Sequence, residues 1–174
     1  MKVIFLFIAF LACYPLHAQE DERWVQAIAR AEQDTERYIR ERIEAGWWYK
    51  GEDTLHVMLV RDTMRIEQAV RYFSEQVKTT ADMRSMNHFL LDEYDKLLNK
   101  YYNRLRGKLS PAQREALLKA QREWLKFRDV EGDFIYKLII DNYGTMGPVL
   151  IGSDCVELLK NRVFQLYSYL QYMD

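Results

Sequence analysis

Three side chains beyond residue 18 are of the types that most often act as nucleophiles, metal ligands or proton carriers: His56, His88 and Cys155. His88 and Asp92 are four residues apart, a spacing that places both on one face of a helix and within reach of one metal ion. No third ligand follows at a spacing typical of zinc sites. We therefore favour a surface histidine beside a carboxylate, and we predict no catalytic residue, no cofactor and no metal.

Cys155 has two interpretations. It follows Ser153 and Asp154, which are typical helix N-cap residues, and a helix N-terminus lowers the pKa of a nearby thiol. The alternative is a small, buried, unreactive residue. We favour the second interpretation.

The composition restricts the kind of fold that carries these side chains. The chain has 174 residues, of which 49% are apolar, and only seven are Gly and three Pro. This favours one helical domain with a sizeable core. The 25 basic and 26 acidic residues nearly balance, so nothing in the overall charge indicates a nucleic-acid partner.

The N-terminus has the pattern of a secretory signal peptide. Lys2 precedes ten apolar residues, 3–12, and the small residue Ala18 precedes a charged stretch. Residues 1–18 are therefore predicted to be removed on export. A second interpretation takes residues 10–13 as a lipobox, in which Cys13 would carry a lipid anchor; we favour cleavage near Ala18. Beyond residue 18, no apolar stretch is long enough to span a membrane.

Helical spacing of apolar residues continues through the rest of the chain. It predicts helices over 20–45, 53–77 and 80–107, a fourth beginning at Ser110, and a last one beginning at Ser153 or Asp154. Thr79 or Thr80 can cap the third helix, and Gln113 can complete a capping box at the start of the fourth. No linker separates these elements, so we predict one all-α bundle of about five helices.

The last two helices are each expected to bury an apolar stripe. In the fourth helix the stripe is Leu117, Ala120, Trp124, Phe127, Phe134 and Leu138. In the last helix it is Val156, Leu159, Val163, Leu166 and Leu170.

Three sequence blocks in the second half of the chain resemble the N-terminal domain of the LprI-type lysozyme inhibitor family. The clearest is residues 120–129, with its Trp and its Arg-Asp pair. The resemblance extends over about residues 80–170, and the residues that carry it include Leu98, Asn99, Tyr102, Gln121, Trp124, Arg128, Asp129, Cys155 and Arg162. We call these nine the signature residues and expect structural roles for them. Residues 19–79 then form an N-terminal helical extension, and residues 80–174 form the LprI-like domain packed with it.

The resemblance implies an exported, periplasmic or secreted helical protein, and for some members inhibition of lysozyme by direct binding. It also implies disulfides that this chain has lost, because family cysteines are absent near Asn87 and near Glu131 while Cys155 remains. Core packing must then replace the ~2–4 kcal/mol that a disulfide typically contributes. We predict a non-enzymatic binding protein whose partner is lysozyme or another envelope protein. The alternative is a non-inhibitory structural or interaction module of the bacterial cell envelope.

Two further features suggest contact surfaces. Residues 20–44 contain eight acids and five bases, whereas residues 104–128 contain eight bases and two acids. Our main interpretation is that these charges pair within the protein. If lysozyme binds, its positive charge favours contact with the acidic first helix over the basic segment. The apolar residues Pro148, Val149, Leu150 and Ile151 lie between glycines. They form either a partner-contact loop or, as we favour, a plug over the helix ends.

Overall fold

The computed structural model describes residues 21–48 and 54–173. The predicted signal peptide, Cys13 and Ala18 lie outside these residues. The described chain forms five α-helices and one short 3-10 turn: α1 (Glu22–Glu44), α2 (Leu55–Ser74), α3 (Thr80–Lys108), α4 (Pro111–Ile139), η1 (Gly144–Met146) and α5 (Gly147–Gln171). None of the described residues forms a strand. The prediction of an all-α bundle is confirmed.

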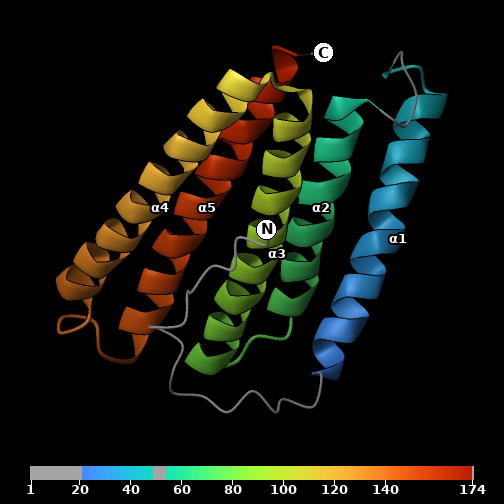
Figure 1. The fold of residues 1–174 in the computed structure, drawn as a ribbon. Coiled ribbons are helices and arrows are strands. Elements are labelled where there is room, and N and C mark those ends of the chain that lie inside the picture. The colour runs from blue at the N-terminus through green and yellow to red at the C-terminus, as the bar shows by residue number, and fades with distance from the viewer. Residues whose placement is uncertain (1–20, 49–53, 174) are drawn as a thin grey trace.

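The helices lie side by side, with α1 and α4 at opposite edges of the molecule (Figure 1). Helix α3 packs most extensively on α5, and α1 packs on α2. Helices α3 and α5 run in the same direction because α4 returns the chain between them (Figure 1). No helix in the described part is long and apolar enough to cross a membrane.

Local sequence explains where α3 and α4 begin. Thr79 and Asp82 form a capping box at the start of α3, and Ser110 and Gln113 form another at the start of α4. Pro111 occupies the first turn of α4, where the missing N–H has no intrahelical acceptor to lose. Both starts agree with the predicted ones.

The interior has two hydrophobic clusters. The larger one lies mainly between α3 and α5, where Tyr94, Tyr101, Val163, Leu166 and Leu170 are almost completely buried. The smaller one joins α1 to α2 and α3. Its aromatic stack places Trp24 between Phe73 and Phe89, with ring centroids 3.9 and 4.3 Å away. Helix α1 therefore contacts α3 as well as α2.

The predicted start of the last helix is wrong. Helix α5 begins at Gly147, and Ser153 and Asp154 lie inside it. Pro148 does not interrupt the helix because it sits in the first turn, where its missing N–H costs no hydrogen bond. The preceding Gly144 has a φ of 51°, which allows the chain to reverse direction before α5.

The predicted core stripe of α4 is also wrong in part. Leu117 is buried and Trp124 half-buried, but Ala120, Phe127, Phe134 and Leu138 are exposed. The buried side chains of α4 are instead Leu117, Gln121, Arg128 and Ile139. Helix α4 packs mainly on α5, and the face that it turns inward carries Gln121 and Arg128 together with Leu117 and Ile139.

Candidate functional site

The signature residues come from α3, α4 and α5. The best-defined contact among them joins Gln121 to Arg162. Arg162 donates from Nε and Nη2 to Gln121 Oε1 at 3.0 and 2.9 Å. Both side chains are buried, and this burial lowers the pKa of the Arg162 guanidinium. Arg162 has no carboxylate at ion-pair distance among the described residues, so the Gln121 amide oxygen is its main partner on α4.

Trp124 lies between two signature arginines. The guanidinium carbons of Arg128 and Arg162 are 5.8 and 5.6 Å from its ring centroid. Arg128 is buried and donates to Asp129 Oδ1 from Nε at 2.9 Å and from Nη2 at 2.5 Å. The contacts of Gln121, Trp124 and Arg162 hold α4 against α5 through hydrogen bonds and a cation–π contact. They support a structural role for these signature residues.

The α3 signature residues lie next to this contact. Leu98 and Tyr102 belong to the larger hydrophobic cluster. Asn99 Nδ2 donates to the Asp95 backbone oxygen at 2.9 Å and to Asp95 Oδ2 at 3.1 Å. Burial raises the pKa of Asp95, and the positive charge of Arg128 opposes that rise. The charge of Arg128 is therefore close enough to Asp95 to affect its pKa.

Cys155 carries a free thiol and is half-buried. It lies well inside α5, roughly two turns after Gly147. Burial, followed by the negative charge of Asp154, raises the pKa of the thiol. The interpretation as a thiol activated by a helix N-terminus is therefore wrong, because the helix begins earlier than its apparent cap residues indicate.

The two histidines of the described residues, His56 and His88, are exposed and lie outside the signature contacts. His88 has a lowered pKa because its ring is partly desolvated and because the charge of Arg84 is close. His56 contacts the edge of the Trp48 ring, with centroids 5.7 Å apart. Within the described residues, no three His, Cys, Asp or Glu side chains are grouped as metal ligands.

The outer face of α4 carries three side chains that sequence periodicity predicts to be buried, Phe127, Phe134 and Leu138, together with Val130. Its exposed apolar side chains are Phe127, Val130, Phe134 and Leu138, with exposed fractions of 52, 71, 57 and 57%. Their spacing of three, four and four residues places them on one face over about 16 Å of helix. We call these four residues the α4 ridge. Apolar periodicity is present in the sequence, but it does not indicate which face meets the rest of the protein.

Charges are distributed unevenly along the same helix. Lys119, Arg122 and Lys126 follow one another at i, i+3 and i+7 beside the N-terminal end of the ridge, and all three are exposed. We call them the basic stripe. Lys126 pairs with Glu123 at 2.8 Å, but neither Lys119 nor Arg122 has a described carboxylate at ion-pair distance. Farther along, Lys137 pairs with Asp133 at 2.5 Å.

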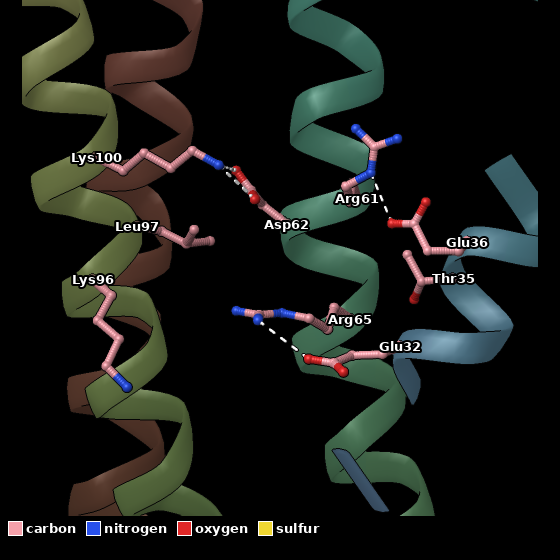
Figure 2. A pocket seen from close by; sticks show the side chains of 9 residues that line it. All are labelled: Glu32, Thr35, Glu36, Arg61, Asp62, Arg65, Lys96, Leu97 and Lys100. Atoms are coloured by element: carbon pink, nitrogen blue, oxygen red, sulfur yellow. Dashed lines mark hydrogen bonds and ion pairs between the residues drawn. The ribbon is translucent and has the colours of Figure 1, made fainter. Parts of the chain in front are cut away.

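Several carboxylates of the acidic first helix form ion pairs within the protein. A surface cleft of about 550 Å³ lies across α1, α2 and α3, and Figure 2 shows the charged side chains that line it. Glu36 of α1 pairs with Arg61 of α2 at 2.8 Å, and Glu32 lies 3.7 Å from Arg65. On the α3 side, Lys100 pairs with Asp62 at 2.6 Å. These ion pairs agree with the intramolecular interpretation of the segregated charge, and the partners of Glu32 and Glu36 lie on α2.

The candidate contact residues 148–151 form the first turn of α5. Val149 and Ile151 are buried, Leu150 is half-buried and Pro148 is exposed. Asn87 Nδ2 donates to the Val149 backbone oxygen at 2.7 Å, which fixes this turn against α3. Most of the apolar surface predicted for a partner is therefore covered by the protein itself.

Comparison with known proteins gives one family match. No curated protein and no solved structure matches the chain. The family model described as "Lysozyme inhibitor LprI" matches residues 74–166, which extend from the end of α2 through α3 and α4 into α5. That segment is more than half of the chain, includes all nine signature residues and contains the α4 ridge. The chain belongs to the LprI lysozyme inhibitor family.

Proposed function

We propose that this chain is an exported helical binding protein that inhibits a lysozyme or another cell-wall hydrolase by direct binding, without catalysis of its own. The observation that carries the proposal is the family match over residues 74–166. The signal-peptide pattern of residues 1–18 supports export to the periplasm or the medium.

An inhibitor needs a preorganised surface, because ordering mobile side chains and loops on binding reduces affinity. Helix α4 meets this requirement through the buried contacts of its inner face. The Gln121–Arg162 hydrogen bonds and the position of Trp124 between two arginines fix its orientation on α5. In this chain, such contacts replace the disulfides expected for the family, so the loss of those cysteines is compatible with a rigid binding surface.

The proposal is tested with the protein purified in the form in which cells export it. Increasing amounts are added to purified lysozymes acting on labelled peptidoglycan, and binding is measured in parallel by calorimetry at low and moderate salt. We expect saturable inhibition of at least one lysozyme, with a stoichiometry near one to one. Absence of both binding and inhibition across the panel would exclude the proposed function.

The alternative is a non-inhibitory interaction module of the cell envelope. The exposed α4 ridge is the observation that favours it, since an apolar surface can bind an envelope protein without affecting a hydrolase. Capture of an envelope protein by the purified chain, combined with full lysozyme activity in its presence, would support this alternative.

A further inference from the structure

We infer that the α4 ridge docks lengthwise into the saccharide-binding cleft of the inhibited hydrolase, with the basic stripe directed toward the catalytic carboxylates of that cleft. This inference rests on the proposed function and assigns the contacting surface. It requires a surface that the protein leaves uncovered, a shape that fits a groove, and a charge that complements the groove.

The first requirement is met by the exposure of the ridge. Single exposed apolar side chains are common on protein surfaces, but four in register on one helix face form a continuous patch. Each of the four is more than half exposed. Helix α4 lies at the edge of the bundle (Figure 1), and its buried side chains occupy a different face from the ridge. Nothing in the described part of the chain covers the patch.

The second requirement concerns shape. An amphipathic helix binds a groove through apolar anchors that recur at three- and four-residue intervals along one face. The ridge has this spacing, and its two aromatic members, Phe127 and Phe134, are separated by about two helical turns. Aromatic side chains supply much of the binding energy of such anchors. The ridge is convex, so its natural complement is a long concave site.

The third requirement concerns charge. Most glycoside hydrolases place two Asp or Glu carboxyl groups on either side of the scissile bond in an elongated cleft. The basic stripe offers three cations beside the N-terminal end of the ridge, and among them only Lys126 has a carboxylate at ion-pair distance in the described chain. The remaining border of the ridge carries balanced charges, such as the Lys137–Asp133 pair. An apolar groove with carboxylates near one end therefore complements the ridge.

The charges near the ridge are less suitable for an anionic membrane. Glu123 is paired with Lys126, but Glu131 lies beside the middle of the ridge, where a membrane that is anionic along the whole ridge would repel it. Cleft carboxylates that lie only near the basic stripe would not face Glu131. A second copy of the chain is the other occupant to consider, because it would bring an identical apolar patch. Light scattering and vesicle binding distinguish these two occupants from the hydrolase cleft.

The decisive variant is Phe134→Asp, with Phe164→Asp as its matched control. Phe164 is 42% exposed and lies on α5, so both variants place a charge at an exposed phenylalanine. A second pair compares Lys119→Glu/Arg122→Glu with Arg40→Glu, which reverses an exposed charge on α1. Circular dichroism and urea unfolding confirm that each variant is folded before its inhibition constant is measured.

For the wild-type protein, we expect inhibition competitive with a soluble oligosaccharide substrate. Phe134→Asp and the double basic variant should each raise the inhibition constant by about tenfold or more, while both controls stay within about twofold. A nonhydrolysed oligosaccharide bound in the cleft should displace the wild-type protein from the hydrolase.

The possible failures lead to different conclusions. If the wild-type protein neither binds nor inhibits any hydrolase, both the proposed function and this inference are overturned. If it inhibits noncompetitively, or if Phe134→Asp inhibits as well as wild type, only the assignment of the ridge is overturned. The assignment of the ridge is also overturned if light scattering shows a wild-type dimer that Phe134→Asp dissociates while inhibition is unchanged. It is likewise overturned if anionic vesicles bind the ridge and the hydrolase does not.

Discussion

Helices α1 and α4 lie at the two edges of the same bundle but have opposite surfaces. Helix α1 buries small and apolar residues, including Ala27, Ala31 and Ile39, and none of its charged side chains is buried. Helix α4 buries Gln121 and Arg128 and exposes an apolar ridge. Helix α4 also buries Leu117 and Ile139, so the two helices differ in the polar groups that α4 buries and in the large apolar side chains that it exposes.

The difference distinguishes a helix whose groups find partners within the protein from a helix that keeps an exposed apolar face. Carboxylates of α1 have partners on α2, including the Glu36–Arg61 pair and the hydrogen bond from the Tyr72 hydroxyl to Asp34. The ridge of α4 has no comparable cover among the described residues. We conclude that α1 contributes to the fold, whereas the outer face of α4 is available to a partner. Substitutions in and around each helix test that comparison.

Among truncations to alanine, the largest expected loss of stability comes from breaking the attachment of α1. Trp24→Ala removes an indole stacked between Phe73 and Phe89 and its hydrogen bond from Nε1 to Ser85 Oγ, 2.9 Å long. We expect the free energy of unfolding in urea to fall by about 3 kcal/mol. Trp47→Ala is the control, because Trp47 is 66% exposed. A loss below about 1 kcal/mol for Trp24→Ala would show that α1 is not held by this stack.

A smaller loss is expected at the inner face of α4. Arg162→Ala leaves the buried Gln121 amide without its partner and removes the guanidinium packed near Trp124, so we expect a loss of about 2–3 kcal/mol. The double variant Gln121→Leu/Arg162→Met replaces both polar groups by apolar ones and should recover part of that loss. Urea unfolding of Gln121→Leu, of Arg162→Met and of the double variant that combines them measures the coupling. Strictly additive losses would mean that the two side chains do not act as a pair.

Much of the fold could be predicted from the sequence because its signals are local. A threonine cap marks the start of α3, and a serine and a glutamine three residues apart mark the start of α4. The predicted apolar stripe of α5 is confirmed, since its members are all buried: Val156, Leu159, Val163, Leu166 and Leu170. This stripe is unambiguous because α5 packs extensively on α3.

The candidate site was harder to predict because it depends on which helix faces meet. Phe127 and Phe134 have core-like spacing, but Gln121 and Arg128 lie on the face that packs inward. Hydrophobicity alone cannot rank these faces when buried hydrogen bonds compensate the polar groups. In the same way, Ser153 and Asp154 have the composition of a cap but lie inside α5, because the helix begins earlier.

A pH-dependent effect is expected where α1 meets the start of α3. Asp82 accepts hydrogen bonds from the Lys78 backbone N–H, from the Thr79 hydroxyl and backbone N–H, and from Arg23 Nη2, and these bonds lower its pKa. A lowered folded-state pKa stabilises the protein above the unfolded value of about 3.8, and this contribution is lost as the pH falls toward the folded value. Asp82→Asn should therefore lower the melting temperature at pH 7, by less than Arg162→Ala does.

The melting-temperature difference between wild type and Asp82→Asn should narrow as the pH falls below about 3.8. Asp92→Asn provides the control on the same helix, since Asp92 is 67% exposed and pairs with Lys96. Thermal unfolding followed by circular dichroism across pH 2–7 checks the prediction, with those pH limits being roughly the range over which carboxylates titrate. A difference that does not change with pH would mean that the charge of Asp82 does not stabilise this junction.

The smallest effect on stability is expected at the α4 ridge itself, and it is the most direct test of the comparison. Phe134→Asp introduces a charge at a side chain already more than half exposed, so we expect the free energy of unfolding to change by less than about 0.5 kcal/mol. Ile39→Asp on α1 places the same charge at a side chain that is 1% exposed, and it should unfold the protein or destabilise it by several times more. Urea unfolding at two protein concentrations measures both. A large loss of unfolding free energy for Phe134→Asp that depends on protein concentration would mean that another copy of the chain covers the ridge in solution. The apolar face of α4 would then be buried before any hydrolase binds, as the apolar face of α1 is.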